Sequence, residues 1–510
     1  MNDCLNIAGN GPDNTPWDIE DDHLHEECGI FGVLGAKDAA QMCALGLHAL
    51  QHRGQEAVGI VSHDGHDFYA HRGQGHVAQV FNSAEVFAGL PGTMASGHVR
   101  YSTTGGSGLR NVQPLFADLH GGGFSIAHNG NISNAMHLKR DLVHKGSIFQ
   151  STSDTEVIIH LVATSRYPTL LDRFIDALRL VEGAYALICT TDEGMIACRD
   201  PQGIRPLVMG RIGDAVVFAS ETVALDVIGA DFVREVEPGE LIQVDPRGTI
   251  SSHRPFGSPA PRPCIFEHVY FSRPDSILGG RSVYEARKAI GMELAKEAPA
   301  DVDLVVPVPD SGVPAAIGYA QQSGVPFELG IIRSHYVGRT FIQPSDGARN
   351  ADVKRKHNAN RALVAGKRIV LIDDSIVRGT TSLKIVEMMR DAGAAEVHMR
   401  IASPPTEHSC FYGVDTPERK KLLAARMDLE EMAAYIKADS LAFVSIEGLY
   451  RAVGAAQRIS SCPQFCDACF TGEYPTSLTD LADRESRVGS APVGAADRRD
   501  YTAPAVARVV

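Results

Sequence analysis

Cys28 is the first residue in the chain whose type and position could do chemistry. It opens the apolar, glycine-spaced run CGIFGVLG directly behind Glu26 and Glu27. A single cysteine in an apolar strand is more often a small buried core residue than a nucleophile. The polar residues that accompany it along the chain therefore have to decide between these two interpretations.

Four polar clusters follow Cys28, and each interrupts an apolar strand or opens a helix. They are LQHRGQEAVGI with Arg53, SGHVRYSTTG with Arg100 and Tyr101, AHNGNISN with Asn129 and Gly130, and TSDTEVIIH with Asp154. Polar groups that converge at strand ends are where ligand sites form. Taken alone, Arg100 and Asp154 would be interpreted as members of structural ion pairs.

Together these stretches resemble the glutamine-hydrolysing domain of the N-terminal-nucleophile amidotransferases, whose mature chains begin Cys-Gly-Ile. The resemblance covers residues 28 to about 230. It implies that Cys28 attacks the glutamine side chain with its own α-amine as the base, because that amine has a reference pKa of about 7.7 to 8.0. An internal Cys28 has only an amide nitrogen, so residues 1–27 are expected to be a propeptide cleaved between Glu27 and Cys28.

The composition of residues 1–27 agrees with a segment that is removed. It contains eight Asp or Glu and no Lys or Arg, which is typical of disorder and unlike a basic transit peptide. The alternative interpretation is that the printed start lies upstream of the real one. In both cases Cys28 must become the first residue.

The same resemblance implies the roles of the other polar residues in this half. The planar guanidinium of Arg100 would bind the α-carboxylate of glutamine, and Asp154 would bind its α-ammonium group. The Asn129 side-chain amide and the Gly130 backbone N–H would form an oxyanion hole. Arg53 and Tyr101 would support the substrate-binding site at the end that holds the nucleophile.

A second site is indicated by RIVLIDDSIVRGTTSLKIVEMMRDAG, residues 368–393. A buried strand precedes two acids, a loop rich in Gly, Thr and Ser, and a helix with Leu383, Val386 and Met389 on one face, which Gly393 is placed to end. In a parallel sheet, ligands bind beyond the carboxyl ends of strands, and a loop that opens a helix offers N–H groups to a phosphate.

This stretch resembles the phosphoribosyl-pyrophosphate (PRPP) motif of the type I phosphoribosyltransferases. Two adjacent carboxylates suit ribose hydroxyls and a Mg²⁺ shell rather than phosphate. Ser311, in VVPVPDSGVPAA, would belong to the pyrophosphate side, although PDSG could also be an ordinary strand-to-helix turn. The implied PRPP residues here are Asp373, Asp374, Ser375, Arg378, Gly379, Thr380, Thr381 and Ser382, and the implied Mg²⁺ site is Ser311, Asp373 and Asp374.

The intervening segment YVGRTFIQPSDGARNADVKRKHNANR, residues 336–361, is long, basic and punctuated by glycine. Loops of this length in a compact domain are usually lids or disordered segments. A lid that brings Arg339 and Lys356 onto PRPP would neutralise the leaving pyrophosphate and exclude water. The alternative interpretation is a solvated run of charges.

Four further cysteines could bind a metal centre. Cys466 and Cys469 form a CxxC in CDACFTGEYP, while Cys264 and Cys410 lie in CIFEHVYF and HSCFYG. A lone CxxC could bind zinc, act in redox chemistry or be chance, whereas four thiolates meet the ligand count of a [4Fe–4S] cluster. The placement resembles a cluster-bearing, propeptide-carrying subgroup of amidotransferases; Cys462 could substitute as a ligand or be a bystander.

With both motif sets in this order, residues 28 to about 475 resemble the glutamine phosphoribosylpyrophosphate amidotransferases, or amidophosphoribosyltransferases. This resemblance implies the first committed step of purine synthesis, in which ammonia released at Cys28 displaces pyrophosphate from PRPP and gives 5-phosphoribosylamine. Ammonia would be protonated in bulk water, so a hydrophobic channel between the sites is expected. Feedback by purine nucleotides and a homotetramer are implied by the resemblance alone.

Three other functions fit the sequence less well. Sugar-phosphate isomerising amidotransferases and asparagine synthetase share the Cys-Gly-Ile glutaminase but lack the DDSIVRGTT loop. A regulator that had lost catalysis should show gaps among the catalytic positions, all of which are filled here. An assembly protein built on the four cysteines would have no glutaminase activity.

Composition is typical of a globular protein. Its 510 residues are 44% hydrophobic and 22% charged, without an apolar run near the roughly 20 residues that span a bilayer, so it is expected to be soluble. A formal charge of −14 argues against nucleic acid as a partner. Ten cysteines are too sparse for a disulfide scaffold, which favours a reducing cytoplasm; Cys43, Cys189 and Cys198 are expected in the core.

The order and hydrophobic pattern of the expected strands and helices predict two folded domains. Residues 28–258 show short strands interrupted by helices near 38–53 and 154–165, which predicts an α+β domain of stacked antiparallel sheets between helices. After the proline-rich boundary, residues 259–480 alternate continuous apolar strands with helices, which predicts an α/β domain with a parallel sheet covered on both faces. Residues 481–510 are expected to be a flexible tail.

Maturation at Cys28 is expected to remove Trp17, the only tryptophan, together with eight acidic residues, moving the formal net charge from −14 to −6. Intact-mass measurement of active purified enzyme should therefore find a chain that begins at Cys28, and its emission spectrum should lack tryptophan fluorescence. Fully active enzyme that retains Trp17 would contradict the role given to Cys28.

Overall fold

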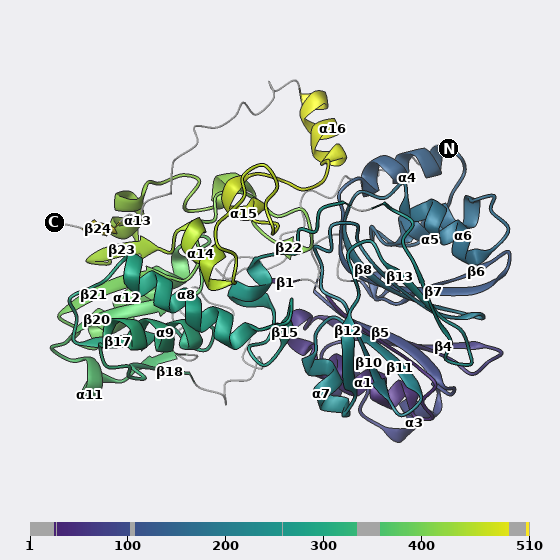
Figure 1. Cartoon of the computed structure of the whole chain (residues 1–510), viewed down its shortest axis with the longest axis horizontal. Coiled ribbons are helices and arrows are strands. Elements are labelled where there is room, and N and C mark those ends of the chain that lie inside the picture. Colours follow the sequence, from purple (N-terminus) through teal and green to yellow (C-terminus); the bar gives the residue numbers. More distant parts are fainter. Residues whose placement is uncertain are drawn as a thin grey trace, which may run out of the picture.

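The structure is a computed structural model that describes residues 25–26, 28–101, 108–257, 259–333, 357–488 and 506–508. Two domains lie side by side in Figure 1, with the purple-to-teal N-terminal half on the right and the teal-to-yellow C-terminal half on the left. Within the described ranges, no helix is long and apolar enough to cross a membrane.

The N-terminal domain contains two antiparallel sheets. The seven-stranded sheet has the order β12-β10-β11-β2-β5-β3-β4, and the six-stranded sheet has the order β14-β13-β9-β8-β7-β6. The strands are β2 (Gly29–Leu34), β3 (Ala57–His63), β4 (Phe68–Gln74), β5 (Met94–Arg100), β6 (Leu115–Leu119), β7 (Gly122–Ile132), β8 (Gly183–Thr191), β9 (Gly194–Arg199), β10 (Val208–Ile212), β11 (Ala215–Ala219), β12 (Asp231–Glu235), β13 (Leu241–Val244) and β14 (Ile250–His253).

Alternating side chains bury both faces of each sheet. In β2, Ile30 and Leu34 enter the core between the sheets, while Phe31 and Val33 pack beneath the helices on the outer face. Each such side chain contributes about 1.5 to 3 kcal/mol when fully buried, so a one-residue slip of register would be strongly disfavoured. The helices are α1 (Ala39–Ala49), α2 (Val77–Val80), α3 (Ala84–Ala88) and α7 (Val223–Ile228) on the first sheet's side, and α4 (Ala135–His144), α5 (Glu156–Thr164) and α6 (Leu170–Leu178) on the other.

The predicted domain of stacked antiparallel sheets between helices is confirmed, and so are the helices near 38–53 and 154–165. Helices α4, α6 and α7 were not predicted. For α6 a signal was present, because Thr169 precedes LLDRFIDAL and its side chain accepts a hydrogen bond from Asp172 N, as an N-cap does.

The C-terminal domain is built on a five-stranded sheet, confirming the predicted parallel arrangement. Its order is β17-β20-β21-β23-β24, and only β24 runs antiparallel to its neighbour. In β20, Val370 and Ile372 join the core on one face while Ile369 and Leu371 join the other, so the continuous apolar run is buried twice over. The elements are β17 (Leu304–Pro307), β20 (Arg368–Asp373), β21 (Glu396–Ile401), β23 (Ser440–Phe443), β24 (Val506–Arg508), α8 (Val283–Glu297), α9 (Val313–Ser323), α11 (Arg361–Val364), α12 (Thr380–Asp391), α13 (Leu429–Tyr435) and α14 (Ile446–Ala452).

Helix α12 carries the predicted apolar face with one shift. Val386 and Met389 are buried, Leu383 is half-buried, and Ile385 completes the buried stripe. Gly393 follows the helix with a φ of +95° and donates its N–H to Arg390 O, which ends the helix as predicted.

Residues 480–483, which follow the C-terminal domain's helices, contact the N-terminal domain. Asp480 accepts hydrogen bonds from the backbone nitrogens of Met136 and His137, both at 2.8 Å, and so caps α4 from another domain. Over the expected tail, α16 (Thr479–Val488) is helical and Asp483 pairs with Arg140. Smaller elements are α15 (Ala468–Thr471), a π-helix (Glu267–Phe271) and three two-stranded sheets, β1 (His25–Glu26) with β22 (Val414–Asp415), β15 (Ile277–Leu278) with β16 (Arg281–Ser282), and β18 (Ile331–Arg333) with β19 (His357–Ala359).

Candidate active sites and a cavity lined by four cysteines

Cys28 lies immediately before β2, at the centre of the seven-stranded sheet. It is buried, its backbone φ is +80°, and its nitrogen donates a hydrogen bond to Arg53 O at 3.0 Å. Because β2 pairs with β5, with Gly29 opposite Val99, Arg100 lies beside the nucleophile's end of the strand. The fold thus brings Cys28, Arg53 and Arg100 together, while the residues after Tyr101, 102–107, lie outside the described part.

Asn129 and Gly130 lie in β7 of the other sheet. Ser220 Oγ accepts from Asn129 Nδ2 at 3.4 Å and from Ile30 N at 3.0 Å, which links the two sheets beside Cys28. Asn129 Oδ1 is buried and has no hydrogen-bond partner among the described residues. Gly130 has a φ of +142°, and a Cβ there would lie 2.1 Å from Ala184 O, so only glycine fits.

Asp154 lies two residues before α5, and two backbone groups orient its carboxylate. Oδ2 accepts from Ile132 N at 2.9 Å and Oδ1 accepts from Thr155 N at 2.8 Å. His128 Nδ1 lies 3.8 Å from Asp154 Oδ2. Burial, followed by the charge of Arg100, lowers the pKa of His98 to about 3, so His98 is neutral where its Nε2 meets His128 O at 3.1 Å.

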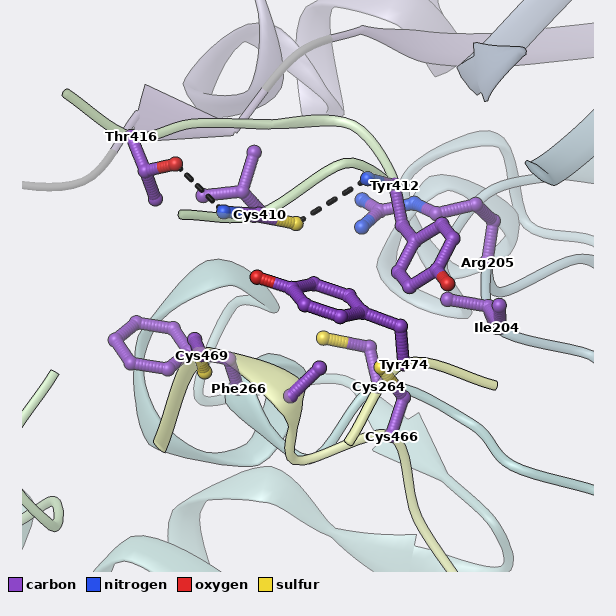
Figure 2. Close-up of a pocket in the computed structure, with 12 residues that line it drawn as sticks. Ile204, Arg205, Cys264, Phe266, Cys410, Tyr412, Thr416, Cys466, Cys469 and Tyr474 are labelled. Atoms are coloured by element: carbon purple, nitrogen blue, oxygen red, sulfur yellow. Dashed lines mark hydrogen bonds between the residues drawn. The ribbon is translucent and has the colours of Figure 1, made fainter. Parts of the chain in front are cut away.

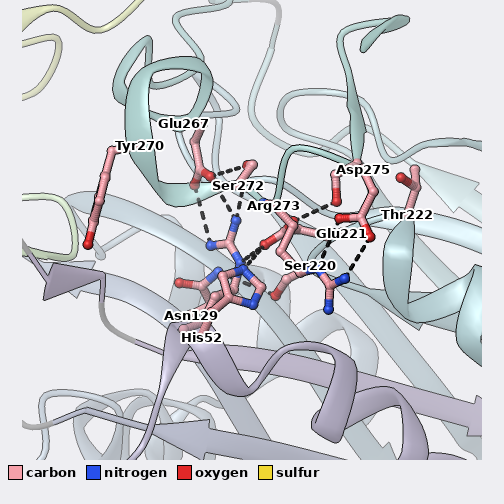
Figure 3. A network of polar contacts seen from close by, with 12 residues as sticks. His52, Asn129, Ser220, Glu221, Thr222, Glu267, Tyr270, Ser272, Arg273 and Asp275 are labelled. Carbon is pink, nitrogen blue, oxygen red and sulfur yellow. Dashed lines mark hydrogen bonds and ion pairs between the residues drawn. The ribbon is translucent and has the colours of Figure 1, made fainter. Parts of the chain in front are cut away.

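Arg53 is the centre of a buried ionic network that joins the two domains, in which Glu221 and Glu267 are the carboxylates labelled in Figure 3. Its Nε contacts Glu221 of the N-terminal domain, and its Nη2 lies 2.7 Å from Oε2 of Glu267 in the π-helix. Glu221 also accepts from Arg273 N at 2.9 Å and from Ser276 Oγ at 2.6 Å. The Arg53 guanidinium is therefore held by carboxylates from both domains, and its contact to Cys28 runs through its carbonyl oxygen.

Glu221, Glu267 and Ser220 are parts of the site that were not predicted from the sequence. A glutamate within an apolar stretch of sequence does not indicate which distant arginine it pairs with in the fold. Burial alone would raise the pKa of Glu221, but Arg53 and then His52 hold it well below its usual value. Glu267 is likewise lowered, against its own burial, by Arg53 and Arg205.

The second candidate site lies at the carboxyl end of the parallel sheet. Val308 N donates to Ile372 O at 2.9 Å, so the turn containing Ser311 begins beside the end of β20. Asp373 and Asp374 are 1% and 2% exposed; Ser375 Oγ donates to Asp374 Oδ1 at 2.7 Å, while Asp374 Oδ2 is buried without a hydrogen-bond partner among the described residues.

The loop after β20 leads into α12 as the sequence predicts. Gly379 has a φ of +81° at the residue before the helix, and Thr380, Thr381 and Ser382 form its first turn, where backbone N–H groups are not used within the helix. The structure thus brings the turn of Ser311 and residues 373–382 to one sheet edge. Arg339 and Lys356 lie outside the described residues.

Cys264, Cys410, Cys466 and Cys469 line one apolar cavity, with Phe266, Tyr412 and Tyr474 among the other lining residues (Figure 2). Ile265 N donates to Cys466 O at 3.1 Å, which joins two of the three segments that carry these cysteines, and Tyr412 N donates to Cys410 Sγ at 3.3 Å.

Cys462 is exposed and does not line this cavity. Burial raises the pKa of the Cys264 thiol to about 12. In the part of the chain that the structure describes, no group of three or more His, Cys, Asp or Glu side chains converges on a single ion. The four thiols instead surround a volume. Cys43, Cys189 and Cys198 are buried in the core, as predicted.

The fold and the two sites define a glutamine amidotransferase joined to a phosphoribosyltransferase. Residues 98–227 match the family described as glutamine amidotransferase domain, and residues 280–403 match the family described as phosphoribosyl transferase domain. The amidophosphoribosyltransferase of Rhizobium etli is 58% identical over 93% of this chain and 97% of its own, and that of Bacillus subtilis is 50% identical over 89% and 95%. The chain belongs to the amidophosphoribosyltransferase family.

Solved structures agree with this assignment. The Bacillus subtilis glutamine PRPP amidotransferase complexed with ADP and GMP superposes with a TM-score of 0.84 at 49% identity, covering 88% of this chain and 98% of its own. A structure described as the allosteric regulatory enzyme of purine biosynthesis gives a TM-score of 0.85 at 49% identity over 88% and 97%. The protein is therefore a glutamine-dependent pentosyltransferase that forms 5-phosphoribosylamine, glutamate and pyrophosphate in the first committed step of purine biosynthesis.

The lowered pKa values of Glu221 and Glu267 predict how stability depends on pH. Their stabilisation is present above the unfolded-state value of 4.5 and is lost as pH falls through the lower folded-state values. Replacing Glu221 by Gln should cost about 3 to 5 kcal/mol at neutral pH, because Arg53 keeps its buried charge with one carboxylate fewer. It should also flatten the pH dependence of the unfolding midpoint below pH 4.5.

Thermal unfolding between pH 3.5 and 7 would measure both effects. The matched control is Glu430→Gln, since Glu430 is an exposed glutamate of α13. Equal midpoints for the two variants across this range would show that the Arg53 network does not stabilise the folded state.

Proposed function

We propose that Cys28, once released from residues 1–27, hydrolyses glutamine, and that the ammonia reacts with PRPP bound at the carboxyl end of β17 and β20. The observation that carries this proposal is the state of the Cys28 nitrogen. As an amide it donates to Arg53 O at 3.0 Å, in a backbone with a φ of +80°. Cleavage would turn this nitrogen into an amine beside the thiol and release about 1 to 3 kcal/mol of backbone strain.

Glutamine would bind across the two sheets of the N-terminal domain. Arg100 would pair with its α-carboxylate, and Asp154, oriented by Ile132 N and Thr155 N, with its α-ammonium group. The Asn129 amide and the Gly130 N–H would bind the oxyanion. Arg53 would act as a positioning residue through its carbonyl, since its guanidinium is engaged by Glu221 and Glu267.

PRPP would bind with its 5′-phosphate on the backbone N–H groups of residues 378–382, where the loop after β20 enters the first turn of α12. Asp373 and Asp374 would meet the ribose hydroxyls and, with Ser311, a Mg²⁺ ion. The buried, unpartnered Asp374 Oδ2 suits such a cation, because Mg²⁺ prefers oxygen ligands. When bound, Mg²⁺ would neutralise the charge that develops on the leaving pyrophosphate. A lid carrying Arg339 and Lys356 stays a prediction.

The four cysteines would hold a [4Fe–4S] cluster with a structural role. A cubane takes one thiolate at each of four iron corners, so its ligands surround a volume, as Cys264, Cys410, Cys466 and Cys469 do. The apolar lining and the Tyr412 N–H donor to Cys410 Sγ also suit a cluster. In this proposal Cys462 is not a cluster ligand, because it is exposed and does not line the cavity.

Regulation by purine nucleotides is part of the proposal, supported by the relative whose structure contains ADP and GMP. A reducing cytoplasm is supported by the cysteines that the structure describes, none of which forms a disulfide bond. The homotetramer stays a prediction from the resemblance.

Replacing Cys28 by Ala should abolish glutamine-dependent pyrophosphate release and leave the ammonia-dependent reaction within about twofold, because the PRPP site lies in the other domain. Steady-state assays with glutamine or with ammonium chloride would measure this. Two results would contradict the proposal. One is that the Cys28→Ala variant still uses glutamine. The other is that the wild-type enzyme, assayed with amide-¹⁵N-labelled glutamine, forms a product without ¹⁵N.

The cysteine assignment can be tested by metal content. Cys466→Ser should lose most of the iron and sulfide and the visible absorption of the purified protein, because one of four ligands is removed. Cys462→Ser, an exposed cysteine four residues away, is the matched control and should keep them. Equal iron content in the two variants, or zinc in wild-type protein, would rule the cluster out.

A further inference from the structure

The turn Cys410–Gly413 belongs to the C-terminal domain but contacts the segment of β7 that carries the proposed oxyanion hole. Gly413 has a φ of +104°, and a Cβ added to it would lie 2.9 Å from Gly130 Cα and 3.1 Å from Gly130 C. Real Cβ atoms essentially never come within 3.0 Å of another heavy atom. The two backbones are therefore in direct contact, and this contact requires glycine at position 413.

Gly130 is confined from two sides. A Cβ on Gly130 would lie 2.1 Å from Ala184 O in the neighbouring strand β8, and Gly413 closes the space beside its Cα. The adjacent Asn131 is tied to the same turn, because its Nδ2 donates to Phe411 O at 2.9 Å. The peptide units around Gly130 thus cannot shift without moving either the sheet or the turn.

The turn itself is held by the cysteine-lined cavity and the segment beyond it. Cys410 N donates to Thr416 Oγ1 at 2.7 Å, and Tyr412 N donates to Cys410 Sγ at 3.3 Å (Figure 2). The buried Tyr412 hydroxyl lies 3.0 Å from Thr476 Oγ1. Gly413 is thereby anchored three residues from a thiol that lines the cavity.

We propose that the turn Cys410–Gly413 is a positioning device for the oxyanion hole, in which Gly413 and Phe411 hold the backbone of Gly130 and Asn131 for glutamine hydrolysis. The inference rests on the proposed function of Gly130. An oxyanion-hole donor stabilises the developing charge only when it lies within about 2.7 to 3.1 Å of it. A displacement of Gly130 by a few tenths of an ångström therefore reduces the stabilisation of the transition state more than it reduces substrate binding. The glutaminase would thus depend on a turn supplied by the transferase domain.

The test replaces Gly413 by Ala. The added methyl group should displace Gly130 and lower kcat with glutamine by about 10- to 100-fold, with KM for glutamine within about threefold, because the interaction lost belongs to the transition state. Ammonia-dependent activity and iron content should match wild type. Hydrogen exchange should accelerate in the β7 peptide that contains Gly130 and Asn131, which is a readout independent of turnover.

Gly65→Ala is the matched control. Gly65 has a φ of +101°, close to that of Gly413, but an added Cβ there meets nothing within 4 Å. It carries the same backbone strain without the contact, so its glutamine kinetics and β7 exchange should equal those of wild type. If Gly413→Ala and Gly65→Ala have equal kcat with glutamine, the proposal is overturned.

A second variant covers the case in which Gly413→Ala does not fold, which loss of ammonia-dependent activity would reveal. Asn131→Ala removes the donor to Phe411 O without adding volume and should lower kcat with glutamine by about threefold to 10-fold; wild-type kinetics and exchange for this variant would overturn the proposal. Cys28→Ala separates the two levels of inference, because retained glutamine use there would refute the role of Cys28 and Gly130 rather than the turn.

Discussion

The buried pairing of Arg53 with Glu221 and Glu267 is the interaction on which the arrangement of the two domains depends. The three side chains are at most 3% exposed, and the two carboxylates come from different domains. A buried charge without its partner costs several kcal/mol, so sliding one domain along the other would strand charge in a low dielectric. Arg53 O also accepts a hydrogen bond from Cys28 N. The same pairing therefore fixes the position of the Cys28 backbone relative to the transferase domain.

Two different sheet topologies solve the same problem of presenting polar groups at strand ends. The antiparallel sandwich places Cys28 and Asn129 on separate sheets that Ser220 connects, so the glutaminase site needs the correct packing of both sheets. In the parallel sheet, the Ser311 turn follows β17, and Asp373 and Asp374 lie at the end of the neighbouring strand β20. Because the two strands run in the same direction, their carboxyl ends lie at the same edge of the sheet. The first site is assembled by packing and the second by strand order.

The C-terminal segment completes the structure by crossing back over the N-terminal domain. Asp480 caps α4, and the turn at Gly413 lies against Gly130, so residues more than 270 positions apart are in direct contact. The four cysteines come from three segments of the chain that meet at one cavity. A covalent or metal-based link at that point would stabilise long loops, whose closure entropy is otherwise unfavourable.

Local sequence determined much of this protein. The alternation in β2 and the apolar run in β20, buried on both faces, are short-range patterns with direct physical meaning, and they predicted both domain folds. The acid pair with its Gly-Thr-Thr loop and the four cysteines carried the resemblance that implied the site residues, Ser311 among them. Helix α6 could have been found from its Thr169 cap. Tertiary structure alone decided which glutamates bind Arg53, that Asp480 caps α4 and that Gly413 contacts Gly130. These partners are distant in sequence and of common residue types, and charge pairing and close backbone approach leave no periodicity along the chain from which they could be predicted.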